Sequence, residues 1–181
     1  MAIRVGMNGF GRIGRYLTRL LMQEGEKDLE LVAINARADS KTYAHMFKYD
    51  SVHGTFKGSV EPYDGGIKIG GRDVKLTTKG ANEWIWGELG VDIVLETSGK
   101  FTEGEKAKGH LQCGAKKVLI SAPGKGVDAT IVPGVNDGEL DVSKQNIISS
   151  ASCTTNCLAP MVKTILENFG WRHGVMTTIH S

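Results

Sequence analysis

The sequence predicts an α/β fold built on a doubly wound, mostly parallel sheet. Short apolar runs alternate with helical patterns, a glycine-rich turn joins the first run to the first helix, and glycine pairs interrupt one central segment. Alternating strands and helices favour a parallel sheet with right-handed crossovers. With 181 residues, 40% of them hydrophobic, the chain can form one domain with a sizeable core and part of a second.

The first unit of the predicted sheet is a strand, a glycine turn, a helix and a second strand. Residues 3–7 (IRVGM) form a short apolar run, and NGFGRIG follows as the turn. Residues 15–25 (RYLTRLLMQEG) continue the helical spacing of apolar side chains that begins at Ile13, which predicts a helix. Residues 29–35 (LELVAIN) predict the second strand.

The sequence pattern of residues 40–78 differs from that of the first unit. Residues 40–50 (SKTYAHMFKYD) predict a helix, for which Ser40 is a plausible N-cap. Residues 59–78 contain two Gly-Gly pairs between short alternating runs, which predicts a small antiparallel hairpin insertion.

The pattern of a parallel sheet then returns. Residues 91–98 (VDIVLETS) predict a strand, residues 103–115 a helix that ends at glycine, and residues 116–121 (KKVLIS) another strand. We therefore place one domain at residues 1–152.

Residues 153–181 predict the beginning of a second, α+β domain. Apolar side chains follow helical spacing from Leu158 to Phe169, and Gly170 is the expected C-terminal cap. The run HGVMTTIH at residues 173–180 then predicts the start of a strand.

The motif Gly9-Phe10-Gly11-Arg12-Ile13-Gly14 has the pattern G-x-G-x-x-G. The first glycine permits a tight turn, the second lets a pyrophosphate approach the backbone, and the third lets the helix pack on the strand. Alone the pattern is weak and also fits a plain glycine turn. Here it follows a strand, opens a helix and precedes a second strand, which predicts a Rossmann-type dinucleotide-binding domain.

Cys153 is the second candidate site. A thiol at a helix N-terminus lies at the positive end of the helix dipole, which favours the nucleophilic thiolate. His180 is the nearest candidate base in the sequence. The alternative is that Cys153 is a small buried hydrophobic residue, which the polar sequence around it disfavours. For Cys157, one turn further along, we expect that buried structural role.

Composition excludes several other classes of protein. The formal net charge is +2 and no basic run is present, so we expect no nucleic-acid partner. No apolar run approaches the length of a membrane-spanning helix, and the start lacks the features of a signal peptide. Three cysteines without a second ligand pair indicate a reducing cytoplasm and no metal site.

Four motifs resemble phosphorylating glyceraldehyde-3-phosphate dehydrogenase, and together they span essentially the whole chain. They are NGFGRIGR at 8–15, KYDSVHG at 48–54, SASCTTNCLAP at 151–160 and MTTIH at 176–180. The resemblance implies that Cys153 attacks the aldehyde of glyceraldehyde 3-phosphate, that His180 is the general base, and that inorganic phosphate releases the resulting thioester. Erythrose-4-phosphate dehydrogenase shares these motifs and is the alternative enzyme.

The resemblance also implies the site residues. Ser152 and Thr154, beside Cys153, match the inorganic-phosphate site. The positions that match the dinucleotide site are Asn8, Gly9, Phe10, Gly11, Arg12, Ile13, Asn35, Ala36, Arg37, Lys79, Thr97, Gly99, Phe101 and Ser121.

Members of the family continue with a catalytic region of similar size, and the resemblance implies a homotetramer active in glycolysis or gluconeogenesis. We therefore expect this chain to be the dinucleotide-binding part of a longer protein or a natural truncation. On either account we expect the 181 residues alone to bind dinucleotide with little or no turnover.

The residues at the end of the second predicted strand indicate whether NAD or NADP is the cofactor. Dinucleotide-binding units commonly carry an acidic residue there that binds the ribose hydroxyls and favours NAD. In the family an aspartate follows Ile-Asn, and here Ala36 takes its place. Arg37 could pair with a 2′-phosphate through its forked donors. The missing acid predicts use of NADP, alone or alongside NAD; the alternative is that Arg37 is a solvated loop charge and NAD still binds.

Overall fold

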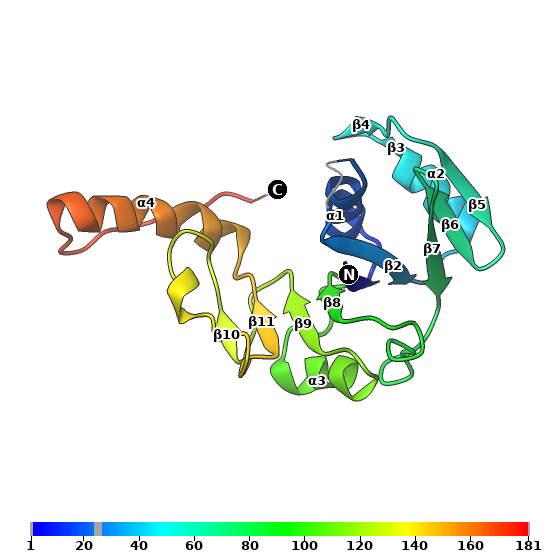
Figure 1. The fold of residues 1–181 in the computed structure, drawn as a ribbon. Helices are drawn as coiled ribbons and strands as arrows, with labels where there is room; N and C mark the ends of the chain where they lie inside the picture. Colours follow the sequence, from blue (N-terminus) through cyan, green and yellow to red (C-terminus); the bar gives the residue numbers. More distant parts are fainter. Residues whose placement is uncertain (1, 24–26, 181) are drawn as a thin grey trace.

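The computed structural model describes residues 2–23 and 27–180, and within them the chain forms a nine-stranded sheet and a separate two-stranded hairpin (Figure 1). In spatial order the strands of the sheet are β10 (Ala129–Thr130), β11 (Ile147–Ser149), β9 (Lys117–Ile120), β8 (Ile93–Glu96), β1 (Ile3–Asn8), β2 (Leu29–Asn35), β7 (Arg72–Thr77), β6 (Gly66–Ile69) and β5 (Val60–Tyr63). Strands β10 to β7 pair in parallel, whereas β7, β6 and β5 pair antiparallel. The hairpin joins β3 (Tyr49–Asp50) to β4 (Gly54–Thr55). The predicted α/β fold, with its parallel sheet and antiparallel insertion, is confirmed.

Helices cover both faces of the sheet. They are α1 (Arg12–Gln23), α2 (Ser40–Lys48), α3 (Gly104–Gln112) and α4 (Cys153–Phe169), and a short 3₁₀ helix, η1, spans Asp137–Glu139. Figure 1 shows α1 and α2 on one face and α3 on the other. On the first face Phe47 of α2 belongs to the same apolar cluster as Val5 and Met7 of β1. On the second face the segment carrying Trp84 and Trp86 packs on Val94.

The starts of the first two helices differ from expectation. α1 begins at Arg12, inside the glycine motif, and the end predicted for it at Glu24 and Gly25 lies outside the described residues. The cap of α2 is Asp39 rather than Ser40, because the Asp39 carboxylate accepts hydrogen bonds from Thr42 N at 2.9 Å and Thr42 Oγ1 at 2.8 Å. The hydrogen bond from the Thr42 backbone, and to a lesser extent that from its hydroxyl, lowers the pKa of Asp39.

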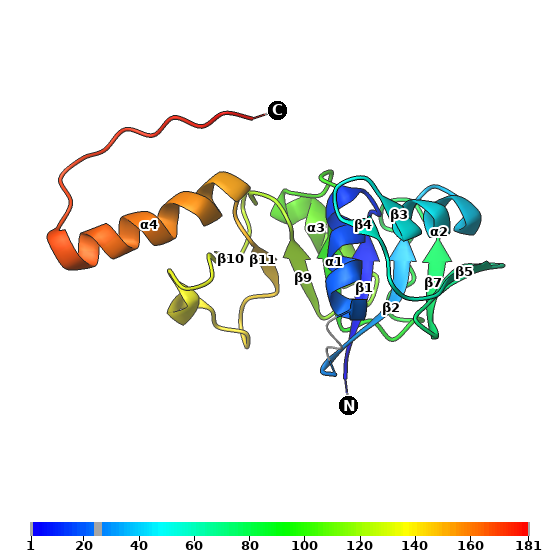
Figure 2. The same ribbon diagram turned by 90° about the horizontal axis from the view of Figure 1, so that it is seen from above.

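Helix α4 extends away from the sheet, and no residue of this helix is buried (Figures 1 and 2). Cys157, expected to be buried, is exposed for this reason. The strand predicted at 173–180 does not form, because a strand needs a neighbour for its backbone groups and none pairs with it in the described part of the chain. The segment instead returns toward the start of α4 (Figure 2). None of the described helices is long and apolar enough to cross a membrane.

Candidate functional site

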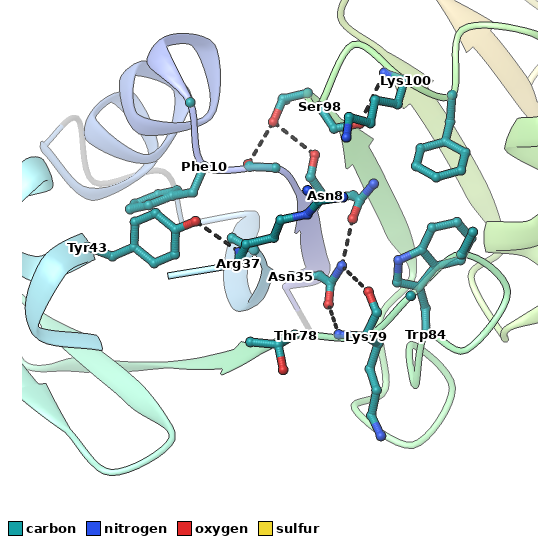
Figure 3. Close-up of a pocket in the computed structure, with 17 residues that line it drawn as sticks. Asn8, Phe10, Asn35, Arg37, Tyr43, Thr78, Lys79, Trp84, Ser98 and Lys100 are labelled. Atoms are coloured by element: carbon teal, nitrogen blue, oxygen red, sulfur yellow. Dashed lines mark hydrogen bonds between the residues drawn. The ribbon is translucent and has the colours of Figure 1, made fainter. Parts of the chain in front are cut away.

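A pocket of about 510 Å³ opens at the carboxyl ends of β1, β2, β7 and β8 (Figure 3). The chain leaves β1 to form β2 on one side and later forms β8 on the other side of β1. Such a reversal of strand order is where doubly wound folds bind their ligands. The volume falls within the roughly 300–1,000 Å³ of small-molecule sites.

The pocket gathers most of the predicted dinucleotide residues. Those that line it are Asn8, Gly9, Phe10, Gly11, Asn35, Ala36, Arg37, Lys79, Thr97 and Phe101. Arg12 and Ile13, on the first turn of α1, Gly99 and Ser121 are not among the lining residues. Sequence reasoning missed Tyr43, Thr78, Gly80, Ala81, Trp84, Ser98 and Lys100, which complete the wall.

The three motif glycines occupy three different environments. Gly9 has φ +97°, and an added Cβ there would lie 2.7 Å from Ser98 N. An added Cβ at Gly14 would lie 2.5 Å from Gly9 O, so this position requires glycine for close packing of helix on turn. A Cβ at Gly11 would have no heavy atom within 4 Å. Gly11 thus leaves an open cradle at the start of α1, where backbone N–H groups favour phosphate.

Two matched substitutions separate these roles. We expect Gly11→Ala to keep the free energy of unfolding within about 0.5 kcal/mol, since nothing opposes the methyl group, while dinucleotide affinity falls at least about 10-fold. We expect Gly14→Ala to lower stability itself. Urea unfolding and calorimetric titration check both results, and a Gly11→Ala variant with unchanged affinity would contradict the cradle.

The charged side chains that line the pocket are all positive. Arg37, Lys79 and Lys100 line it, and no acidic side chain is among the described lining residues. These three cations have no salt-bridge partner within residues 2–23 and 27–180. The acidic residue nearest to Arg37 in the sequence, Asp39, accepts hydrogen bonds from Thr42 as the cap of α2. The pocket wall therefore favours an anionic ligand.

The loop that carries Arg37 is held in place by Tyr43. The backbone N–H groups of Arg37 and Ala38 donate to Tyr43 Oη at 3.0 and 3.1 Å (Figure 3). The Tyr43 ring meets Phe10 of the glycine turn edge-on, with 5.2 Å between ring centroids. Ala36 is only 9% exposed, whereas Arg37 is exposed. The tip of β2 thus presents a small apolar side chain and an adjacent guanidinium.

A second group of candidate residues follows β11. Because β11 is parallel to β9 and β8, its carboxyl end lies on the same edge of the sheet as the pocket. Ser152 caps α4, and its Oγ accepts from Thr155 N at 2.9 Å. Cys153 is the first residue of the helix and is exposed. His180 Nε2 lies 3.3 Å from Thr154 Oγ1, so the structure brings the predicted base to the residue beside Cys153.

Backbone strain lies just before this cap. Ala151 is buried and has φ +59°, a conformation that strains any residue with a Cβ. We expect Ala151→Val to destabilise the chain by roughly 1–3 kcal/mol, because a β-branched side chain fits this conformation poorly. We expect Ala151→Gly to stay within about 1 kcal/mol of the unaltered chain. Urea unfolding compares them, and equal stability of the two variants would contradict the strain.

Comparison with known proteins agrees with this geometry. The family model for the glyceraldehyde 3-phosphate dehydrogenase NAD binding domain matches residues 3–104, and the model for the C-terminal domain of that family matches residues 152–181. Glyceraldehyde-3-phosphate dehydrogenase of Streptomyces coelicolor is 50% identical over all of this chain and 54% of its own length. The enzymes of Geobacillus stearothermophilus and Thermotoga maritima are each 48% identical over 100% and 98% of this chain.

The chain spans about half the length of these curated relatives. The matched NAD binding model covers more than half of its residues, including the glycine turn and the strands that form the pocket. The chain therefore belongs to the glyceraldehyde 3-phosphate dehydrogenase family.

Proposed function

We propose that this chain is the dinucleotide-binding portion of an NAD(P)-dependent, phosphorylating glyceraldehyde-3-phosphate dehydrogenase. One observation carries the proposal: the glycine-turn pocket and the exposed Cys153 lie on the same edge of one sheet. Residues 1–152 form the dinucleotide-binding domain, and residues 153–181 begin the catalytic domain. The open cradle at Gly11 supports the fit of a pyrophosphate.

In the proposed reaction the Cys153 sulfur attacks the aldehyde carbon of glyceraldehyde 3-phosphate, and His180 takes the hydroxyl proton. A dinucleotide held at Gly9, Gly11 and the rest of the pocket wall would supply the hydride acceptor, and Cys153 would then carry the oxidised acyl group as a thioester. Inorganic phosphate, held by Ser152 and Thr154, then attacks the thioester carbon, forms the acyl phosphate and frees the thiol. The position of Cys153 at the positive end of α4 supports its role as nucleophile.

The proposal extends to the cofactor. A carboxylate at the end of β2 would attract the ribose hydroxyls of NAD and repel a 2′-phosphate, and Ala36 does neither. The acid-free wall with Arg37 beside Ala36 supports binding of NADP, alone or alongside NAD. The dinucleotide contacts proposed for Asn8, Gly9, Phe10, Asn35, Lys79, Thr97 and Phe101 are supported by their positions in the pocket wall.

Calorimetric titration of the chain with NAD⁺ and with NADP⁺ tests the proposal. Saturable binding of NADP⁺, at least as tight as that of NAD⁺, is the expected result. Binding should weaken as salt concentration rises, because the wall attracts the phosphates by charge. Failure of both dinucleotides to bind at millimolar concentration would overturn the proposal.

The setting of the whole enzyme belongs to the same proposal. A reducing cytoplasm is part of the proposal, because three cysteines are an odd and sparse set for a disulfide framework. The family implies a homotetramer that works in glycolysis or in the reverse, biosynthetic direction.

A further inference from the structure

A buried acid–base pair borders the pocket and takes no part in the chemistry proposed above. Glu96 ends β8 and His110 lies on α3, and their side chains are fully buried. Glu96 Oε2 lies 3.0 Å from His110 Nε2, and Trp86 Nε1 donates to His110 Nδ1 across 3.0 Å. Because an indole nitrogen only donates, Nδ1 must accept. The ring proton therefore sits on Nε2 and is donated to Glu96.

Among the described residues, each hydrogen-bond partner of the Glu96 carboxylate is a donor. Oε1 accepts from Ser98 N at 2.7 Å and Ser98 Oγ at 2.5 Å, and Oε2 accepts from Asn8 Nδ2 at 2.6 Å as well as from His110. An ionised carboxylate only accepts, so it satisfies all four donors at once. Two of the residues that it holds, Asn8 and Ser98, line the pocket.

The carboxylate also fixes the direction of a longer hydrogen-bonded chain. Since Asn8 turns its Nδ2 to Glu96, its Oδ1 faces Asn35 and accepts from Asn35 Nδ2 at 2.9 Å. The Asn35 amide must then present its Oδ1 on the other side, where it accepts from Lys79 N and Thr77 Oγ1, both at 2.8 Å. Figure 3 shows the chain passing from Asn8 through Asn35 to Lys79.

We propose that Glu96 is the positioning residue of the dinucleotide pocket: its charge orients the amides of Asn8 and Asn35 and thereby fixes both Ser98 and Lys79 in the wall. Trp86 and His110 support this role, because the hydrogen bond from Trp86 keeps the ring proton of His110 on Nε2, which donates to the carboxylate. The inference rests on the proposed function for its ligand, but the orientation of the relay is a property of the ligand-free chain.

Replacing Glu96 with glutamine exposes the role of the charge. If the new amide turns its oxygen to Asn8 and His110, its NH₂ group faces Ser98 N. If it turns its oxygen to Ser98, its NH₂ group faces His110 Nε2–H and the Asn8 amide must flip. Asn35, whose Nδ2 also donates to Lys79 O at 3.1 Å, then either opposes Asn8 with its own NH₂ group or flips and opposes Lys79 N. In either arrangement two hydrogen-bond donors face each other, without an acceptor, at a residue that lines the pocket. Glu96→Asp keeps the charge and the direction, with a shorter reach.

The test compares the two variants by titration with NADP⁺ and by amide hydrogen exchange without ligand. We expect Glu96→Gln to lower affinity at least about 10-fold and to speed exchange of Ser98 N–H or Lys79 N–H at least about 10-fold. We expect Glu96→Asp to retain more affinity than Glu96→Gln. If shape rather than charge matters, the isosteric glutamine will bind better than aspartate, and the proposal is overturned.

Two controls keep the result interpretable. Ser149→Ala removes another fully buried hydrogen-bonding group, whose partners Ala122, Gly124 and Ala151 do not line the pocket, so affinity should stay unchanged. In the unaltered, ligand-free chain Lys79 N–H should exchange as slowly as amides of β1. Fast exchange there would overturn the proposal even if Glu96→Gln does not fold, whereas failure of the unaltered chain to bind dinucleotide would overturn the proposed function alone.

Discussion

In a family-length enzyme that contains this chain, Cys153→Ser is expected to abolish aldehyde oxidation while leaving dinucleotide affinity nearly intact. A serine hydroxyl is a far weaker nucleophile than a thiolate, so no thioester can form. We expect kcat to fall by roughly 10⁴-fold or more, the scale seen when a nucleophile is removed. Cys153 is not among the pocket-lining residues, so titration with NADP⁺ should give almost the same affinity.

Cys157→Ser is the matched control, because Cys157 lies four residues later on the same helix and is also exposed. It should retain most of the activity. Steady-state assays with glyceraldehyde 3-phosphate, phosphate and dinucleotide measure both variants. Loss of activity in Cys157→Ser with full activity in Cys153→Ser would show that the wrong thiol had been assigned.

The sequence predicted the parallel strands β1, β2, β8 and β9, the antiparallel insertion and the glycine turn of the pocket because their signals are local, but it missed β10 and β11. The glycine motif lies between strand and helix, and each parallel strand that was predicted is a short apolar run. The His110–Glu96 pair had no such signal, since its members lie 14 residues apart and meet only in the folded chain. The one visible clue was a charged residue, Glu96, closing the apolar run IVLE. A charge in such a place needs partners, and only the structure identifies them.

Residues 173–180 show that a local signal alone can also mislead, because the strand that they predict does not form. Their β-branched residues Val175, Thr177, Thr178 and Ile179 favour a strand, but a strand also requires a pairing partner. Val175 and Ile179 are 97% and 94% exposed, so neither their backbone nor their side chains have the contacts that would specify one. The cap of α2 was misplaced for a local reason, because Asp39 and Ser40 are both good capping residues and the geometry of one carboxylate decides between them.

Ala36→Asp is expected to change the cofactor preference of the pocket from NADP to NAD. The new carboxylate at the tip of β2 should bind the ribose hydroxyls of NAD and repel a 2′-phosphate. We expect NADP⁺ affinity to fall roughly 10- to 100-fold, which corresponds to about 1.4–2.8 kcal/mol, and NAD⁺ affinity to hold or rise. Arg37→Ala should weaken NADP⁺ alone, since it removes a donor to the 2′-phosphate and leaves the pyrophosphate cradle at Gly11 untouched.

The matched control for this charge is Ala81→Asp, which adds a carboxylate elsewhere in the same pocket wall. A general effect of negative charge would weaken both dinucleotides at either position, because both carry a pyrophosphate. A local effect at the ribose will instead change the ratio of the two affinities only for Ala36→Asp. Titration of each variant with both dinucleotides at one salt concentration separates these cases. A clear preference of the unaltered chain for NAD⁺ that persists in Arg37→Ala would show that Arg37 is a solvated loop charge and that the acid-free strand end does not select NADP.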